Sequence, residues 1–111
     1  MNLEIFAHDM PVAPQVRQYA EAKVRRLDRH YDRIQNARLE LDLAARKRLE
    51  PLKVAELLVH VNGTIIKGRA IAPHIQEAVD LVVDKVDNRL RKRKERIKDH
   101  KALPAGGTPR R

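Results

Sequence analysis

The side chains in this sequence with the clearest chemical potential are cations that recur at helical spacing. Four of them follow one another at steps of four, three and four residues and so share one helix face: Lys85, Arg89, Lys92 and Arg96. Residues 89–101 hold eight Lys or Arg residues against two acidic ones, a local net charge of +6 within a total of +9. Cations at this density repel one another, which favours an extended polyanion as their partner. The alternative is a solvated helix end whose cations interact with the helix dipole.

A second group of cations lies in the first third of the chain. Three arginines recur there every four residues, and two further cations flank them: Arg25, Arg29 and Arg33, with Lys23 and Arg26. On a helix this stripe lies opposite the apolar residues and faces solvent. We predict that the following residues contact the polyanion: Lys23, Arg25, Arg26, Arg29, Arg33, Lys85, Arg89, Arg91, Lys92, Arg93 and Arg96.

The other reactive side chains form no recognisable catalytic or metal-binding set. The histidines are scattered, and no two share metal-ligand spacing on one helix face: His8, His30, His60, His74 and His100. Cysteine and serine are absent from the sequence, and the hydroxyl groups are those of Tyr19, Tyr31, Thr64 and Thr108. We therefore predict no enzymatic activity, no metal and no cofactor.

The composition indicates one domain with a nucleic-acid partner. A chain of 111 residues, 42% of them hydrophobic, is long enough for one core. A signal peptide and an apolar run of roughly 18–20 residues are both missing, so we expect a soluble cytoplasmic protein. The basic segment has no Trp or Phe, which disfavours a membrane surface. Aromatic residues make up 3% of the chain, too few for extensive base stacking, so folded or double-helical RNA is the expected partner.

Residues 73–101 are predicted to form one long helix that begins with Pro73 in its first turn. Its apolar residues recur at three- and four-residue steps: Ile75, Val79, Val82, Val86 and Leu90. At ~1.5 Å per residue the helix is roughly 40 Å long, so its basic end must overhang a strand of ~17–20 Å. Arg93 stands where another core residue is expected, so the apolar face should end near Leu90. Three aspartates on exposed turns could pair with Lys85, Asn88 or Arg91: Asp80, Asp84 and Asp87.

The remainder of the chain alternates in the manner of strands. We predict strands at residues 3–8, 38–43, 53–61 and 64–71, with a loop at 44–52. Asn62-Gly63 indicates a type I′ hairpin turn, which requires positive φ at both positions. Pro14 opens a helix that runs to His30 or Tyr31, and its apolar face consists of Val16, Ala20, Val24, Leu27 and Tyr31.

The element order β-α-β-β-β-α predicts a two-layer α+β domain over residues 1–101, with two helices on one face of a four-stranded sheet. The first two strands should be parallel and the other neighbours antiparallel. Lys67 and Arg69 face outward, and Glu40, Glu56 and Lys67 can pair across strands on that open face. Three apolar residues also point that way and could form a small patch: Phe6, Leu58 and Ile65. The composition of residues 102–111 indicates a flexible tail or the start of a linker.

Several segments resemble the ribosome hibernation promoting factor and ribosome-associated inhibitor family, in nearly continuous register over residues 1–101. They are Met1-Asn2-Leu3-Glu4-Ile5, Ala22-Lys23-Val24-Arg25-Arg26-Leu27-Asp28, Tyr31-Asp32-Arg33-Ile34, His60-Val61-Asn62-Gly63, and Asp84-Lys85-Val86 leading to Leu90 and the basic run. One departure lies at the start of the last helix, where His74 and Gln76 replace the family's acidic and tyrosine residues.

The resemblance implies a fold similar to a double-stranded-RNA-binding domain. It also implies binding to rRNA of the small ribosomal subunit, in competition with mRNA and tRNA, which blocks translation in stress and stationary phase. The cations above would then be rRNA contacts. A monomer is expected. The tail after Lys101 is where the linker to the dimerising domain of longer family members would begin, and the chain is either a short form or a truncated long form.

Two alternatives stay open. One is a general structured-RNA-binding or transcription-modulating protein on the same fold. The other is a protein-interaction module that uses the sheet face around Phe6, Leu58 and Ile65, with the basic helices serving solubility.

Overall fold

The computed structural model describes residues 1–31, 33–44 and 50–102, with residues 95–102 described by their backbone alone. The elements occur in the order β1 (Asn2–Ala7), α1 (Pro14–His30), β2 (Ile34–Ala44), β3 (Leu52–Val61), β4 (Thr64–Ala72) and α2 (Ile75–Ala102). The central part of the expected loop at 44–52 and the expected tail after residue 102 lie outside the described residues.

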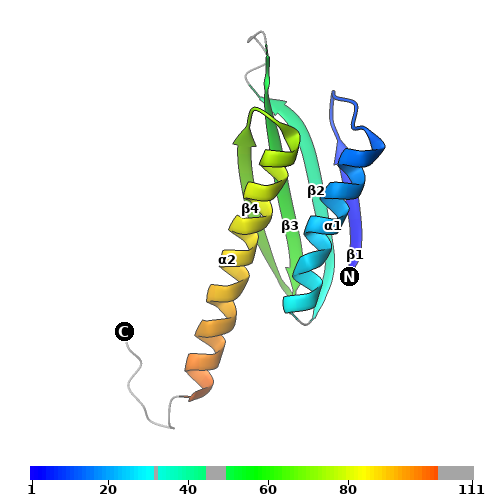
Figure 1. The fold of residues 1–111 in the computed structure, drawn as a ribbon. Coiled ribbons are helices and arrows are strands. Elements are labelled where there is room, and N and C mark those ends of the chain that lie inside the picture. Colours follow the sequence, from blue (N-terminus) through cyan, green and yellow to red (C-terminus); the bar gives the residue numbers. More distant parts are fainter. Residues whose placement is uncertain (32, 45–49, 103–111) are drawn as a thin grey trace.

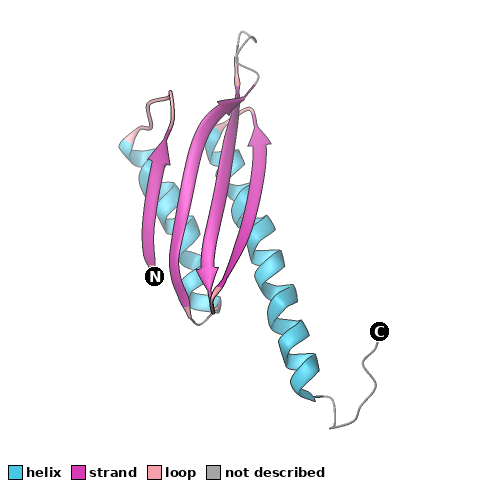
Figure 2. Ribbon diagram, turned by 180° about the vertical axis from the view of Figure 1, so that it is seen from behind, coloured by secondary structure: helices cyan, strands magenta, loops and turns pink. Residues whose placement is uncertain are grey.

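The four strands form one sheet in the order β1-β2-β3-β4. β1 is parallel to β2, and the other neighbouring pairs are antiparallel. Both helices cover the same face of the sheet, and the other face is open (Figure 1 and Figure 2). The α+β prediction and the strand directions are confirmed.

Local sequence explains how the elements start and stop. Pro14 occupies the first turn of α1, where its missing N–H and fixed φ are compatible with the helix. Asn62 and Gly63 have φ of 51° and 74°, as a primed hairpin turn requires. The last helix starts two residues later than predicted, at Ile75, and the N–H of Ala78 donates to the carbonyl of His74 at 3.0 Å. Pro73 therefore precedes the helix instead of opening it.

The core lies between the sheet and the two helices. Three side chains of α1 belong to it: Ala20, Val24 and Leu27. The central strands β2 and β3 contribute Leu39, Leu41, Leu57 and Val59. The apolar face of α2 contributes Val79, Val82, Val86 and Leu90. Leu90 is the last buried side chain of the described part of α2, and Arg93 is half-buried. Beyond that point α2 extends past the end of the sheet, as its length predicts (Figure 1).

β2 begins at Ile34, four residues before the predicted start. Ile34 and Ala37 are both buried, although residues three apart on a regular strand face opposite sides of the sheet. A register irregularity between Ile34 and Asn36 lets both side chains face the core. The irregularity breaks the period-two pattern, so alternation alone marks only the later part of this strand.

Candidate nucleic-acid interface

Three of the cations on α1 make contacts within the fold: Lys23, Arg25 and Arg17, which donates to the carbonyl of Ile5 at 3.5 Å. Lys23 faces α2, and its Nζ lies 3.3 Å from Oδ1 of Asp80, with 22% of the side chain exposed. Arg25 turns toward the start of β1, where it lies 3.5 Å from Glu21 and donates to the carbonyl of Met1 at 3.4 Å. The charged groups of Lys23 and Arg25 therefore contact other parts of the fold and are only partly available to an external ligand.

Three arginines near the end of α1 are exposed and form no ion pair or hydrogen bond with the described residues: Arg26, Arg29 and Arg33. We call them the α1 arginines. The predicted stripe does not continue along the helix to Arg33, because α1 ends at His30 and Arg33 lies in the following turn with φ of 70°. The chain reverses there to enter β2, so Arg33 is placed by a turn and not by helical periodicity.

The cations of α2 fall on different sides of the helix. Arg91 lies 3.0 Å from Asp87, whose charge raises the pKa of that guanidinium. Lys94 lies 5.8 Å from the ring centroid of Tyr31. Arg93 is half-buried, Lys92 is exposed, and the side chain of Arg96 lies outside the described residues.

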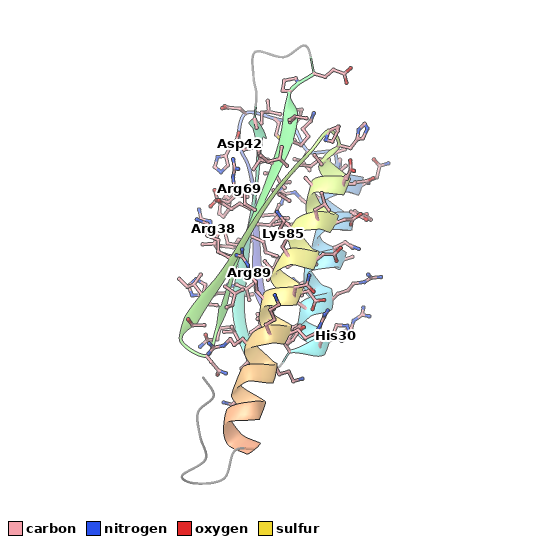
Figure 3. All side chains as sticks on the ribbon, turned by 90° about the vertical axis from the view of Figure 1, so that its left-hand side faces the viewer. His30, Arg38, Asp42, Arg69, Lys85 and Arg89 are labelled. Carbon is pink, nitrogen blue, oxygen red and sulfur yellow. The ribbon has the colours of Figure 1, made fainter. Side chains whose placement is uncertain are left out.

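Lys85 and Arg89 contact the backbone of the edge strand β4. The Nζ of Lys85 donates to the carbonyl of Arg69 at 2.7 Å, and Nη1 of Arg89 donates to the carbonyl of Lys67. These two carbonyls point away from β3, since the hairpin register leaves the backbone of residues 67 and 69 without cross-strand bonds. Figure 3 shows Lys85 and Arg89 between α2 and β4.

A hollow runs along this edge and gathers five cations from two elements: Lys67, Arg69, Lys85, Arg89 and Lys92. We call it the β4–α2 groove. Sequence alternation predicts Lys67 and Arg69 on the outward side of β4, but the predicted site leaves both of them out. The signal that could have included them is their alternation on a strand that directly precedes the basic helix.

The aspartates of α2 form the seam between the helices. The hydroxyl of Tyr19 donates to Asp80 at 2.6 Å, and that of Tyr31 donates to Asp87 at 2.7 Å. The prediction that Asp80 pairs with neighbours on its own helix is wrong, because α1 lies close enough to supply Tyr19. For Asp87 the predicted partner Arg91 is present in addition to Tyr31.

These contacts raise the pKa of both phenols. The hydrogen bond to Asp80 is the main cause for Tyr19, followed by burial. Burial is the main cause for Tyr31, followed by the hydrogen bond to Asp87. Each carboxylate accepts a hydrogen bond from a phenol that stays neutral, so the seam holds two charge-assisted hydrogen bonds at neutral pH.

The open sheet face carries ion pairs as well as exposed apolar side chains. Lys67 lies 3.8 Å from Glu56 as predicted, whereas Glu40 pairs with Arg38 at 2.9 Å and with His8 at 3.1 Å. The expected apolar patch is not continuous. Phe6 and Ile65 lie on the two opposite edge strands, and the guanidinium of Arg38 covers the Phe6 ring at 4.4 Å.

The surface of the described part of the chain offers neither a metal site nor a membrane span. No three His, Cys, Asp or Glu side chains there lie close enough together to hold a metal ion. Neither described helix is both long enough and apolar enough to cross a membrane. The arrangement is a set of cationic surfaces around the two helices, suited chemically to binding phosphate groups.

The sequence matches a known protein family over most of its length. The family model described as Sigma 54 modulation protein / S30EA ribosomal protein matches residues 3–98. The chain belongs to this family. A curated relative, the ribosome hibernation promoting factor of Azotobacter vinelandii, is 33% identical over 96 residues, which is 86% of this chain and 85% of the relative.

Solved structures agree with the S30EA family fold. The N-terminal domain of Thermus thermophilus Protein Y superposes with a TM-score of 0.71 at 25% identity, covering 83% of this chain and 98% of that domain. A ribosomal subunit interface protein from Coxiella burnetii shares the fold, with a TM-score of 0.75 at 22% identity over 86% of this chain and 99% of that one. The likeness to a double-stranded-RNA-binding domain stays a prediction.

Proposed function

We propose that this protein is a ribosome hibernation factor of the cytoplasm that binds rRNA of the small ribosomal subunit. It occupies the channel used by mRNA and tRNA and inhibits translation by occupancy, with no chemical step. Membership of the S30EA family supports the link to ribosomes. The observation that carries the proposal to RNA is the concentration of exposed cations on a small domain of net charge +9.

The α1 arginines supply one part of the interface. They are exposed and form no ion pair with the described residues, so RNA phosphates can bind them without displacing a partner in the described part of the chain. The overhanging end of α2 supplies another part, because its backbone leaves the sheet and its sequence is almost purely basic (Figure 1). A rigid helix that stands clear of its own domain can enter a groove of folded RNA.

Inhibition by occupancy requires stoichiometric action. Each copy silences the one ribosome that it occupies, so a cell-free translation reaction titrated with the protein should lose activity in proportion to the ribosomes present. Excess mRNA and initiator tRNA should restore translation by mass action, and raised salt should restore it because counterions are released on binding. A variant with Arg26→Glu and Arg29→Glu provides the control, since charge reversal should abolish inhibition at the same concentrations.

Complete inhibition at far below one copy per ribosome would contradict occupancy, as would cleaved or modified rRNA in the reaction. A second candidate comes from the family description itself, which also names sigma 54 modulation. Sedimentation separates the two. Comigration with small subunits at moderate salt supports the ribosomal role, whereas absence from the subunit fraction together with binding to sigma 54 supports the second candidate. Equal binding to any RNA duplex would instead indicate a general structured-RNA binder.

A further inference from the structure

The β4–α2 groove is built by a close approach of helix and strand. Gly68 is one of the residues that line the groove, and a Cβ at this position would lie 2.9 Å from Cγ2 of Val86 and 3.5 Å from Cγ2 of Val82. A larger residue would hold α2 away from the edge of the sheet. Because position 68 is glycine, Lys85 and Arg89 come near enough to reach the carbonyls of β4.

The hydrogen bonds to these carbonyls hold the side chains of Lys85 and Arg89 in place and leave some of their N–H donors unused. A lysine ammonium has three N–H donors and an arginine guanidinium has five. Lys85 and Arg89 each bond to one carbonyl of β4, so both keep donors that can point into the groove. Anchored side chains lose less conformational freedom when a ligand binds, which favours binding.

The strand adds two cations to the same groove. Lys67 and Arg69 are exposed on β4, with 59% of the Lys67 side chain accessible. One carboxylate lines the groove against the five cations, that of Glu56, which lies 3.8 Å from Lys67. Arg69 and Arg38 lie on the open side of the sheet, and His30 at the end of α1 lies on the opposite side of the molecule (Figure 3). The groove is therefore a surface separate from the α1 arginines.

The lining favours a phosphodiester backbone over a protein segment. No apolar side chain occurs among the described residues that line the groove, whereas protein interfaces depend on buried apolar and aromatic anchors. From residue 85 to residue 92 the cations extend over about 10 Å of helix at ~1.5 Å per residue. A run of positive charge of that length suits a strand that carries a phosphate at every nucleotide.

We propose that the β4–α2 groove binds the phosphodiester backbone of an RNA strand, and that Lys67 and Arg69 of β4 contact its phosphates together with Lys85, Arg89 and Lys92. The inference rests on the proposed function and adds to it a second RNA-binding surface on the sheet edge. Lys85 and Arg89 have two roles there. Each donates a hydrogen bond to a backbone carbonyl of the edge strand β4, and each presents its remaining N–H donors to the RNA.

The test compares two variants with equal loss of charge. The groove variant carries Lys67→Gln and Arg69→Gln. The control variant carries Arg17→Gln and Arg38→Gln on α1 and β2, outside the groove. Each variant removes two cations and breaks one pair with a carboxylate, Lys67–Glu56 or Arg38–Glu40. Affinity for purified small ribosomal subunits and for an RNA hairpin is measured at several salt concentrations, with thermal melting to confirm folding.

For the groove variant, the slope of log K against log salt should fall by about 1.4–1.8, because each lost phosphate contact removes ~0.7–0.9. The control variant should keep the slope of the unmodified protein. If the two variants have equal salt slopes with small subunits, the proposal that the groove binds RNA is wrong, whereas the proposed ribosomal function is unaffected. If the unmodified protein fails to bind small subunits, the proposed function fails, and the hairpin measurement alone then decides the groove by the same comparison. Equal affinity of the unmodified protein for the hairpin and for an acidic peptide of matched charge would also overturn the proposal.

Discussion

The hydroxyl of Tyr31 donates a 2.7 Å hydrogen bond to Oδ1 of Asp87 and lies 3.1 Å from the carbonyl of the same residue. Tyr31 directly follows α1, and Asp87 lies in the middle of α2, so this contact joins the end of one helix to the other. The Tyr19–Asp80 bond joins the same helices nearer to the start of α2. Together they fix how far α2 can rotate about its axis, and hence which of its cations face the edge of β4.

Tyr31→Phe should lower the free energy of unfolding by about 1–2 kcal/mol at neutral pH, since a hydrogen bond to a charged group on a half-exposed residue is lost. Burial and the bond to Asp87 raise the pKa of Tyr31 in the folded protein. The contribution is therefore complete below the unfolded pKa of about 10 and disappears as pH rises through the higher folded value. Urea unfolding of both proteins between pH 7 and 11 measures this. A difference that stays constant across that range would contradict the assignment.

Gly68→Ala should destabilise the protein by about 1–3 kcal/mol, because the added methyl group would meet Val86 at 2.9 Å in a packed interface. Gly63→Ala serves as the comparison. That position has φ of 74° and no neighbouring atom within 4 Å of where the methyl carbon would lie, so its cost comes from the backbone alone. A double-mutant cycle of Gly68→Ala with Val86→Ala should show coupling, since the smaller valine replacement makes room for the methyl group. Strict additivity would mean that the two residues do not compete for space.

Leu41→Ala should cost ~2–5 kcal/mol in unfolding free energy, because Leu41 is fully buried between the sheet and the helices. Leu58→Ala on β3 provides the matched control, since Leu58 points to the open face and is half-buried. Chemical denaturation compares the two. Equal losses would show that the two faces of the sheet are equally buried in solution, contrary to a core on the helix side alone.

Arg26→Gln with Arg29→Gln should weaken binding to small ribosomal subunits and lower the salt slope by about 1.4–1.8, since two phosphate contacts are lost. Arg25→Gln is the control, because Arg25 contacts Glu21 and the carbonyl of Met1. The Arg25→Gln change should lower the salt slope by less than the ~0.7–0.9 expected for the loss of one phosphate contact. If Arg25→Gln weakens binding more than the double variant, the RNA-binding surface of α1 faces β1 and not the outer side.

Local sequence determined which elements form and most of the core, but not the start of β2, where Ile34 and Ala37 are buried. The alternation of Leu39 and Leu41 with charged residues, the Asn62-Gly63 turn and the apolar steps from Val79 to Leu90 each depend on near neighbours in the chain. Such patterns reflect the periods of helix and strand, so they remain visible without the fold. The positive charge of the interface is likewise a property of composition.

Tertiary structure alone decided which cations are available and where they gather. Lys23 forms an ion pair with Asp80 because α1 packs against α2. Lys85 donates to the carbonyl of Arg69, 16 residues away in the sequence, because β4 also packs against α2. The groove depends on Gly68, whose role appears once a helix approaches it, and Arg33 leaves its helical stripe because the chain turns into β2. These outcomes arise from contacts between segments far apart in the sequence, and periodicity along the chain carries no information about which distant side chain will satisfy a given charge.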